Sequence, residues 1–220
     1  TLEEVLKKEN PTHIGVAFDP AGPTFRHEAF EQYKAQREET PEAIRLSVPI
    51  IKDIIRAYRI PILEVAGYEA DDKDYGQLVS DKVFMYRPKH TGGFEVMGVE
   101  EVKAKFDIQS PTQVIDMLGL MGDSSDNIPG CPGVGEKTAQ KLVSEFGSIE
   151  NLLEHTDQLK GALKTKVETN REMITFSKFL ATIKIDVPIQ LEMDALVREE
   201  ADENSLRSIF EELEFRTLID

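Results

Sequence analysis

A pair of glycines in the second half of the chain constrains the fold most strongly. Gly133 and Gly135 flank a single apolar residue, Val134, and small and basic residues follow them. Periodic apolar residues predict one helix over 112–121 and another over 136–146. Glycine permits the backbone conformations that a tight connection between two helices needs. The pattern therefore predicts a helix-hairpin-helix unit.

The chemistry of this hairpin suits a phosphate group. Glycines let the main chain approach a ligand closely, and the N-terminus of the following helix offers unpaired N–H groups. Lys137 and Lys141 lie one helical turn apart, so both add positive charge to one face. The candidate DNA-binding residues are Gly133, Val134, Gly135, Lys137, Thr138 and Lys141. Such a motif contacts the backbone and not the bases. An ordinary pair of helices with a glycine turn is the alternative, and the Gly-Val-Gly-x-Lys spacing disfavours it.

The first half of the chain predicts an α/β sheet. An amphipathic helix over 2–8 precedes the apolar stretch His13–Asp19, which is typical of a buried strand that ends in a carboxylate. A long helix is predicted from about Pro41 to Tyr58, and a second short strand over 62–65. Ligand sites of such sheets lie at the carboxyl ends of the strands. Asp19 is therefore placed where chemistry is expected.

The remaining segments complete a two-part organisation. A β-hairpin is predicted over 82–87 and 94–97, and the pattern is mostly helical from Val99 onward. A last amphipathic helix spans 202–213, with Asp202 as its cap. We expect a soft boundary near Ser110. The predicted domains are an α/β metal-binding domain over 1–109 and a helical duplex-binding region over 110–220.

The pattern breaks near residues 71–73. Glu69 to Asp72 resembles the start of a helix after a strand, whereas Lys73 to Leu78 resembles a loop and helix that follow a different strand. A crossover between parallel strands needs a dozen or more residues. We therefore expect a helix and a strand to be absent between Asp71 and Lys73.

Carboxylates gather in three separate segments, each beside a glycine or at the end of a strand. The candidate metal ligands are Asp19, Glu69, Asp71, Asp72, Asp74, Asp123 and Asp126. Converging carboxylates repel one another unless cations intervene. Mg²⁺ prefers such oxygen ligands and suits phosphate substrates, and two such ions would support phosphodiester hydrolysis. Each aspartate alone could equally be a helix cap or a turn residue. No capping role explains four acids between Glu69 and Asp74.

The composition sets further limits. The chain has 220 residues and a formal charge of −15, so a basic protein that coats DNA without regard to its structure is disfavoured. Its single cysteine, Cys131, excludes an internal disulfide and suits a reducing cytoplasm. No apolar run is long enough to span a membrane, and residues 1–4 do not resemble a signal peptide.

A polar stretch between the first strand and the long helix carries three cations. Arg26, Lys34 and Arg37 fall close to helical spacing, so they could contact the scissile phosphate or a displaced strand. A solvated, charged helix is the simpler interpretation of this stretch taken by itself.

Taken together, the motifs resemble a known family. Phe18-Asp19, Phe25-Arg26-His27, Tyr33 to Arg37, Gly67 to Asp72, Lys73 to Leu78 and Gly122 to Gly130 occur in the order found in the 5′ nuclease (flap endonuclease) domain of bacterial DNA polymerase I. The resemblance covers nearly the whole chain. It implies a PIN-like, mostly parallel central sheet with helices on both faces, followed by the helix-hairpin-helix subdomain.

The resemblance also implies a function. It implies a nuclease that hydrolyses phosphodiesters at 5′ flaps, nicks, gaps and RNA-primer junctions, with two or more Mg²⁺ ions (or Mn²⁺) held by the seven acidic residues. Arg26, Lys34 and Arg37 match the catalytic arch region, and the hairpin Gly133–Gly135 would hold the downstream duplex with a K⁺ ion. A polymerase domain in the same natural chain, replication and repair as the process, and the bacterial cytoplasm follow from the same resemblance.

Two departures from the family pattern leave a second hypothesis open. The family begins with a strand that carries a further metal-binding aspartate, and this chain starts after it; the helix and strand after Asp71 are the second omission. The alternative function is a non-catalytic module that binds DNA structure. A phosphatase on small substrates is disfavoured, because it leaves the hairpin without a role.

Overall fold

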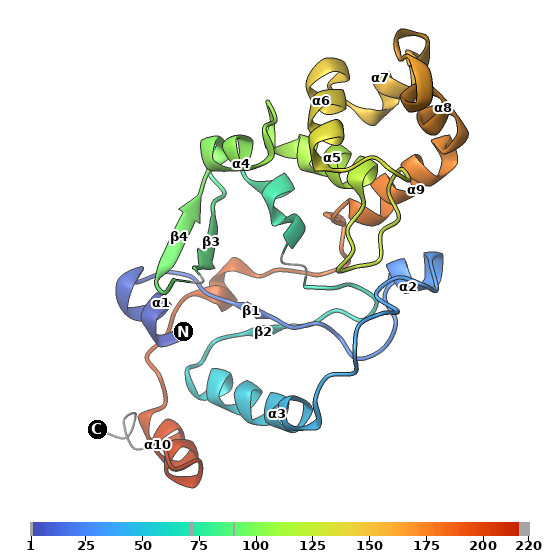
Figure 1. Ribbon diagram of the computed structural model, residues 1–220. Helices are drawn as coiled ribbons and strands as arrows, with labels where there is room; N and C mark the ends of the chain where they lie inside the picture. The colour runs from blue at the N-terminus through green and yellow to red at the C-terminus, as the bar shows by residue number, and fades with distance from the viewer. Residues whose placement is uncertain (1, 71–72, 90, 216–220) are drawn as a thin grey trace. The chain divides into compact units, whose positions relative to one another are not determined.

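A computed structural model describes residues 2–70, 73–89 and 91–215 (Figure 1). The chain forms two compact units. One comprises residues 1–24, 38–70 and 186–220, and the other comprises residues 25–37 and 71–185. Each of these units is made of separate segments of the chain, whereas the predicted domains are two continuous stretches, 1–109 and 110–220. The boundary near Ser110 therefore stays a prediction.

The first unit contains a short parallel sheet. Its elements are α1 (Leu2–Lys8), β1 (Val16–Ala17), α3 (Glu42–Ala57), β2 (Ile62–Leu63), the 3₁₀ turn η4 (Met193–Leu196) and α10 (Glu203–Glu212). Val16 lies opposite Ile62 and Ala17 opposite Leu63. The α/β class is confirmed, but within the described residues the parallel sheet has only these two strands, fewer than the predicted central sheet.

The first strand is shorter than the predicted span over 13–19. His13 forms an antiparallel bridge with Val197, and the Ile14 N–H donates to the Leu196 carbonyl at 2.7 Å. The first half of the predicted strand therefore pairs with a segment 184 residues further along the chain, since His13 pairs with Val197. The second half pairs with β2. This change of partner divides the predicted strand.

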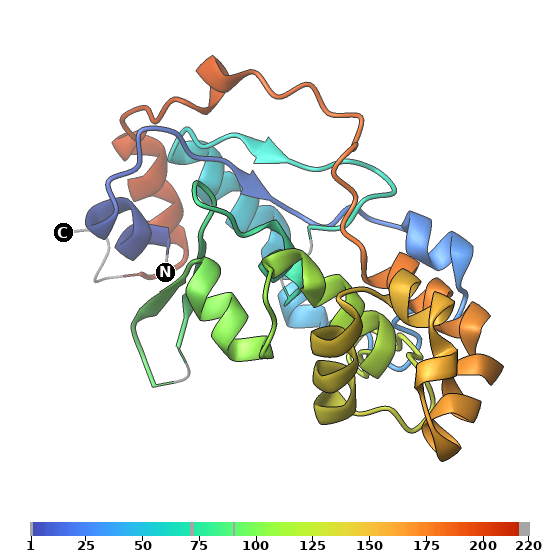
Figure 2. The same cartoon turned by 90° about the horizontal axis from the view of Figure 1, so that it is seen from above.

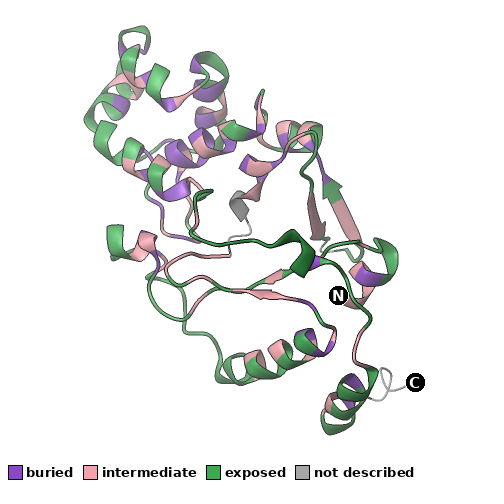
Figure 3. Ribbon diagram, turned by 180° about the vertical axis from the view of Figure 1, so that it is seen from behind, coloured by how far each residue is buried: buried purple, intermediate pink, exposed green. Residues whose placement is uncertain are grey.

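The two long helices of the first unit pack near their ends. Leu206 and Phe210 of α10 are buried together with Ala57 of α3. The side chain of Asp202 caps α10 by accepting from the Ser205 N–H at 3.1 Å, as predicted. Leu46, about three turns before Ala57 on the same side of α3, is exposed. Figure 3 shows much of α3 in the colour of exposed residues.

The second unit is mainly helical. Its elements are α2 (Phe25–Ala29), η1 (Lys73–Leu78), β3 (Met85–Pro88), β4 (Phe94–Met97), α4 (Val99–Phe106), η2 (Pro111–Gln113), α5 (Val114–Met121), α6 (Glu136–Phe146), α7 (Ile149–Glu154), η3 (Thr156–Gln158), α8 (Gly161–Thr169) and α9 (Arg171–Ala181). Strands β3 and β4 form the predicted hairpin, with Arg87 opposite Glu95. Helix α6 has the predicted bounds, and the helix expected from Thr112 begins as a 3₁₀ turn at Pro111 before α5.

Helix α5 lies at the centre of the main core. Val114, Met117 and Leu120 are buried. Helix α5 packs against α6, α7 and α9 (Figure 2). The end of the loop that follows α5 is held by two hydrogen bonds: the Gly130 N–H donates to the Ser177 hydroxyl at 2.9 Å, and the Cys131 N–H donates to the Leu120 carbonyl at 2.7 Å. Among the described residues, no helix combines the length and the apolar character needed to cross a bilayer.

Candidate metal centre and nucleic-acid interface

Two predicted ligands of the first unit follow neighbouring strands. Asp19 comes after β1, and Glu69 comes after β2. Because the strands are parallel, their carboxyl ends meet at one edge of the sheet. The Asp19 Oδ1 atom accepts from the Ala70 N–H at 2.7 Å, so these two segments lie together. The side chain of Asp19 is exposed and thus open to a cation.

Two further predicted ligands lie in a tight loop of the second unit. Asp123 and Ile128 exchange backbone hydrogen bonds of 3.0 and 2.8 Å, which close the loop. The Asp123 carboxylate accepts from the Ser125 N–H at 2.6 Å. Gly130 ends the loop with φ +62°, and a Cβ there would lie 2.4 Å from the main-chain nitrogen of Gly122. The sequence Gly122–Gly130 therefore fixes where both carboxylates lie.

The polar segment 32–37 binds along this loop. The Lys34 N–H donates to the Asp126 carbonyl at 3.0 Å, and the Arg37 Nε donates to the Ser125 carbonyl at 3.2 Å. Gln36 also donates to the Ser124 carbonyl. This segment is a series of turns after the five-residue helix α2, and not the continuation of one helix that the spacing of its cations suggested.

The Asp126 carboxylate is the centre of a compact charged cluster. It is 8% exposed, and Arg37 reaches Oδ1 at 2.5 Å. Lys34 Nζ lies 3.9 Å from Oδ2, and the Tyr33 hydroxyl donates to the same oxygen at 3.3 Å. Two cations therefore face one buried carboxylate. The predicted ligand and the predicted phosphate-contacting cations Lys34 and Arg37 are brought together here.

Tyr33 is a residue of this cluster that the sequence reasoning did not select. Its side chain is 2% exposed, and the Lys34 ammonium lies 4.9 Å from the centre of its ring. One signal for its burial was available in the sequence. Tyr33 is an aromatic residue among charged neighbours, in a segment that was otherwise predicted to be solvated. Its burial indicates that the segment 32–37 is packed and not a free surface loop.

Arg26 occupies a different environment from the one predicted. Its side chain is 1% exposed, with Nε 2.7 Å from the Leu180 carbonyl and a terminal nitrogen 3.2 Å from the Thr182 carbonyl. These oxygens belong to the C-terminal end of α9, where helix carbonyls lack intrahelical partners. In this structure Arg26 anchors α2 to α9, and burial withholds its guanidinium from a phosphate.

The rest of the predicted metal set is not gathered by the described residues. Asp71 and Asp72 lie outside them, and Asp74 lies on η1. Over residues 2–70, 73–89 and 91–215, no three His, Cys, Asp or Glu side chains are placed to hold one ion. The donor chemistry fits a hard divalent cation, since all predicted ligands are carboxylates. The complete ligand set stays a prediction.

The predicted hairpin connects the α5 loop to α6. Gly133 adopts φ +76°, a conformation that L side chains rarely adopt, and Val134 is buried between the helices. The Lys166 Nζ atom donates to the Gly133 carbonyl at 3.2 Å. Gly133 and Gly135 themselves are exposed, so the main chain of the hairpin is accessible.

Helix α6 presents its N-terminus beside this hairpin. Gly135 stands at the N-cap position without a side chain to bond the first N–H groups. Lys137 and Lys141 are exposed on the first two turns, and Thr138 is half-buried between them. The site therefore combines free N–H donors with two cations, as a phosphate backbone requires.

Two ion pairs of Lys178 join α5, α7 and α9. Lys178 Nζ lies 2.7 Å from Asp116 Oδ1 and 2.7 Å from Glu150 Oε2, and Asp116 also accepts from the Ile149 N–H at 2.9 Å. Burial opposes the charged ammonium, but the two carboxylates outweigh burial and raise the pKa of Lys178. Burial also raises the pKa of the Cys131 thiol, which disfavours a reactive thiolate.

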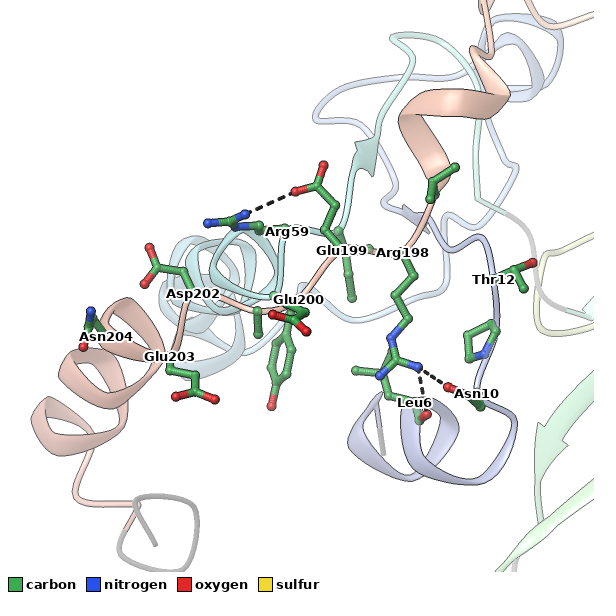
Figure 4. A pocket seen from close by; sticks show the side chains of 15 residues that line it. Leu6, Asn10, Thr12, Arg59, Arg198, Glu199, Glu200, Asp202, Glu203 and Asn204 are labelled. Carbon is green, nitrogen blue, oxygen red and sulfur yellow. Dashed lines mark hydrogen bonds and ion pairs between the residues drawn. The ribbon is translucent and has the colours of Figure 1, made fainter.

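A cavity of the first unit holds none of the predicted site residues. It has a volume of about 1090 Å³ and is lined by side chains of both signs (Figure 4). Arg59 pairs with Glu199 at 3.3 Å, and Arg198 donates to the Asn10 side chain at 2.9 Å. These pairs satisfy its two arginines within the wall.

Two family models match the sequence. The model described as 5′-3′ exonuclease, N-terminal resolvase-like domain, matches residues 1–73, and the model described as 5′-3′ exonuclease, C-terminal SAM fold, matches residues 109–204. The chain belongs to the 5′-3′ exonuclease family. This confirms the resemblance on which the sequence prediction depended.

The relatives that match this chain are several times longer than the chain itself. DNA polymerase I from Bacillus caldotenax is 39% identical and that from Bacillus subtilis 40% identical, each over 243 residues that cover all of this chain. The chain spans 28% of the length of either relative. Since the chain has 220 residues, at least 23 aligned positions have no counterpart in it. The omission predicted after Asp71 stays a prediction.

Solved structures share the fold at low identity. T5 5′-exonuclease with bound zinc has a TM-score of 0.70 at 21% identity, covering 96% of this chain and 88% of that one. The catalytic core of Rad2 in complex with a DNA substrate has a TM-score of 0.59 at 18% identity, covering 89% and 73%. These likenesses confirm the fold of a 5′ nuclease.

Proposed function

We propose that the chain is a structure-specific 5′-3′ exonuclease and flap endonuclease that hydrolyses phosphodiesters by two-metal catalysis. The observation that carries this proposal is the cluster around Asp126, where a buried carboxylate meets Arg37 and Lys34 in a chain of the 5′-3′ exonuclease family. Anionic metal ligands and phosphate-binding cations at one place are what phosphodiester hydrolysis requires.

The proposed ligands of two Mg²⁺ or Mn²⁺ ions are Asp19, Glu69, Asp71, Asp72, Asp74, Asp123 and Asp126. When bound, such ions supply Lewis-acid activation of water and stabilise the leaving oxygen. The residues of the chain perform the other tasks. Lys34 and Arg37 bind and orient the scissile phosphate, and the Tyr33 hydroxyl orients Asp126. Arg26 anchors the segment that carries these cations.

The duplex beyond the cut is bound by the hairpin. Main-chain N–H groups at Gly133, at Gly135 and at the start of α6 contact one strand, and Lys137, Thr138 and Lys141 extend this contact. The Val134 N–H donates to the Cys131 carbonyl at 2.9 Å and fixes the shape of the hairpin. A K⁺ ion bound to main-chain oxygens of the hairpin would compete with the Lys166 ammonium, which donates to the Gly133 carbonyl at 3.2 Å. Replacing K⁺ by a larger organic cation tests whether duplex binding needs this ion.

The substrates proposed are 5′-flap, nicked and gapped DNA and RNA-primer junctions. A polymerase domain in the same natural chain is supported by the share of DNA polymerase I that this chain spans. Replication and repair in the bacterial cytoplasm follow from that attachment. The comparisons give no support to the alternative, a non-catalytic module that binds DNA structure.

Cleavage of a labelled 5′-flap duplex with Mg²⁺ and with a chelator tests the proposal. We expect release of the flap with Mg²⁺ and intact substrate with the chelator. The variant Lys137→Ala tests the duplex contact in the same experiment. It should weaken duplex binding, and the slope of log affinity against log salt concentration should become smaller by about one. Duplex binding with intact substrate under both conditions would establish the non-catalytic alternative.

A further inference from the structure

The C-terminal half of α9 contacts three segments of the second unit that carry candidate site residues. The Ser177 hydroxyl accepts from the Gly130 N–H at 2.9 Å, at the end of the loop 122–130 with its two predicted carboxylate ligands. Arg26 donates to the Leu180 carbonyl at 2.7 Å and so anchors α2, which leads to the cations of the charged cluster. The third segment is η1. One helix therefore holds the carboxylate loop, α2 and η1.

Gln77 makes the contact between η1 and α9. Its Nε2 atom donates to the Ala181 carbonyl at 3.0 Å, and its Oε1 atom accepts from the Ile183 N–H at 2.9 Å. Gln77 is 7% exposed, although glutamine side chains are mostly exposed in folded proteins. A side-chain amide both donates and accepts, whereas a carboxylate or an ammonium would satisfy only one of these two main-chain groups. The position therefore requires an amide.

Gln77 and the proposed ligand Asp74 lie on the same 3₁₀ turn. They are three residues apart, which is one turn and a rise of about 6 Å. Any rotation of η1 against α9 therefore moves the main chain that carries Asp74. Val79, directly after η1, is buried in the main core, so η1 stays attached when the amide contact is removed. The amide contact thus sets the orientation of η1 and not its attachment.

We propose that Gln77 is a positioning residue for the candidate metal centre. It fixes η1, and with it Asp74, to the same helix that fixes α2 and the loop 122–130. The inference rests on the proposed nuclease function, because Asp74 is a ligand only if the centre binds divalent ions. Replacing a residue that orients metal ligands typically weakens metal affinity 10–100-fold. Gln77 should therefore affect metal affinity in addition to stability.

The test measures Mn²⁺ binding to the full chain without DNA, through the loss of the electron paramagnetic resonance signal of free Mn²⁺. Gln77→Met keeps the length of the side chain and removes both hydrogen bonds, so it should raise the Kd for Mn²⁺ about tenfold. Ile183→Pro breaks the same contact from the side of α9, because proline has no N–H. Thr182 already has the extended backbone that suits a residue before proline. This variant should raise the Kd in the same direction.

Gln113→Met is the matched control, because Gln113 makes the same kind of contact elsewhere in the second unit. Its Nε2 atom donates to the Gly147 carbonyl at 2.9 Å, and its Oε1 atom accepts from the Gln109 N–H at 2.8 Å. Both glutamine variants should lower the urea midpoint, but Gln113→Met should change the Kd for Mn²⁺ less than twofold. An unchanged Kd in Gln77→Met and Ile183→Pro, or an equal rise in Gln113→Met, would overturn the inference and leave the metal centre in place. Absence of Mn²⁺ binding by the unsubstituted protein would instead overturn the proposed metal centre, and the inference with it.

Discussion

The ion pair beneath the hairpin allows a quantitative test of how the second unit is held together. Lys178 contacts two carboxylates at the same distance of 2.7 Å, but the Asp116 side chain is 8% exposed and the Glu150 side chain 65% exposed. Asp116 also accepts the Ile149 N–H, at the first residue of α7. One cation thus has a buried partner and an exposed partner that can be removed separately.

Asp116→Asn keeps the shape of the side chain and removes its charge. A hydrogen bond between charged groups out of water contributes about 2 kcal/mol, so the free energy of unfolding should fall by about that amount. Glu150→Gln should lower it by only about 0.5 kcal/mol, because solvent screens an exposed pair. In a chain of this size the Asp116 change corresponds to a fall in Tm of roughly 4–8 °C.

Urea unfolding followed by far-UV circular dichroism measures both variants against the unsubstituted protein. Asp116→Asn should move the midpoint to lower urea at an unchanged slope, and Glu150→Gln should move it little. In the double variant the free energy of unfolding should fall by more than the sum of the falls in the two single variants, because Lys178 would lose both partners. Equal effects of the two single variants would refute the reasoning from burial.

Four further outcomes are expected. Asp123→Asn should abolish Mg²⁺-dependent flap cleavage while duplex affinity stays within twofold, measured by gel assays on one substrate; retained cleavage would remove Asp123 from the ligand set. Gly133→Val should weaken duplex binding about tenfold in a titration, because φ +76° strains a β-branched residue. Tyr33→Phe removes the hydroxyl that donates to Asp126 and should cost about 1 kcal/mol in urea unfolding. The raised pKa of Lys178 means that its stabilisation is complete below the ordinary lysine pKa and is lost as the pH rises through the higher folded value, so thermal scans from about pH 9 to 12 should show an alkaline loss that Asp116→Asn reduces.

The elements that the sequence predicted best are those that local signals determine. Helix α6 begins directly after Gly135, which stands at its N-cap with an extended backbone, and its apolar residues recur at helical spacing over the predicted span. Asp202 caps α10 by a contact three residues away. Such interactions are contained in a short window of sequence, so pattern reasoning captures them.

The differences arise where long-range contacts decide the outcome. The strand predicted over 13–19 is divided because Val197, far along the chain, pairs with its first half. Arg26 was assigned to a phosphate because of its spacing from Lys34 and Arg37 and its match to the arch region of the family, yet carbonyls at the C-terminal end of α9 bind it in the interior. Tyr33 was not selected because its polar segment was expected to be solvated, whereas its side chain is buried. A composition cannot indicate which polar segment will be covered by a distant loop.

The structure also suggests how an enzyme that does not read bases could cut at a defined position. Asp126 and Gly133 are seven residues apart, and the intervening chain is fixed by Gly130, whose N–H bonds the Ser177 hydroxyl at 2.9 Å, and by Cys131, whose N–H bonds the Leu120 carbonyl at 2.7 Å. Seven residues span at most about 25 Å. Under the proposed function, the cleaved phosphate and the phosphate held by the hairpin therefore lie within about seven nucleotides along one strand, at roughly 3.4 Å each. Because hydrogen bonds to α5 and α9 fix this connection, the distance is set by the fold. The position of the cut then follows from where the duplex is bound, and no base contact is needed.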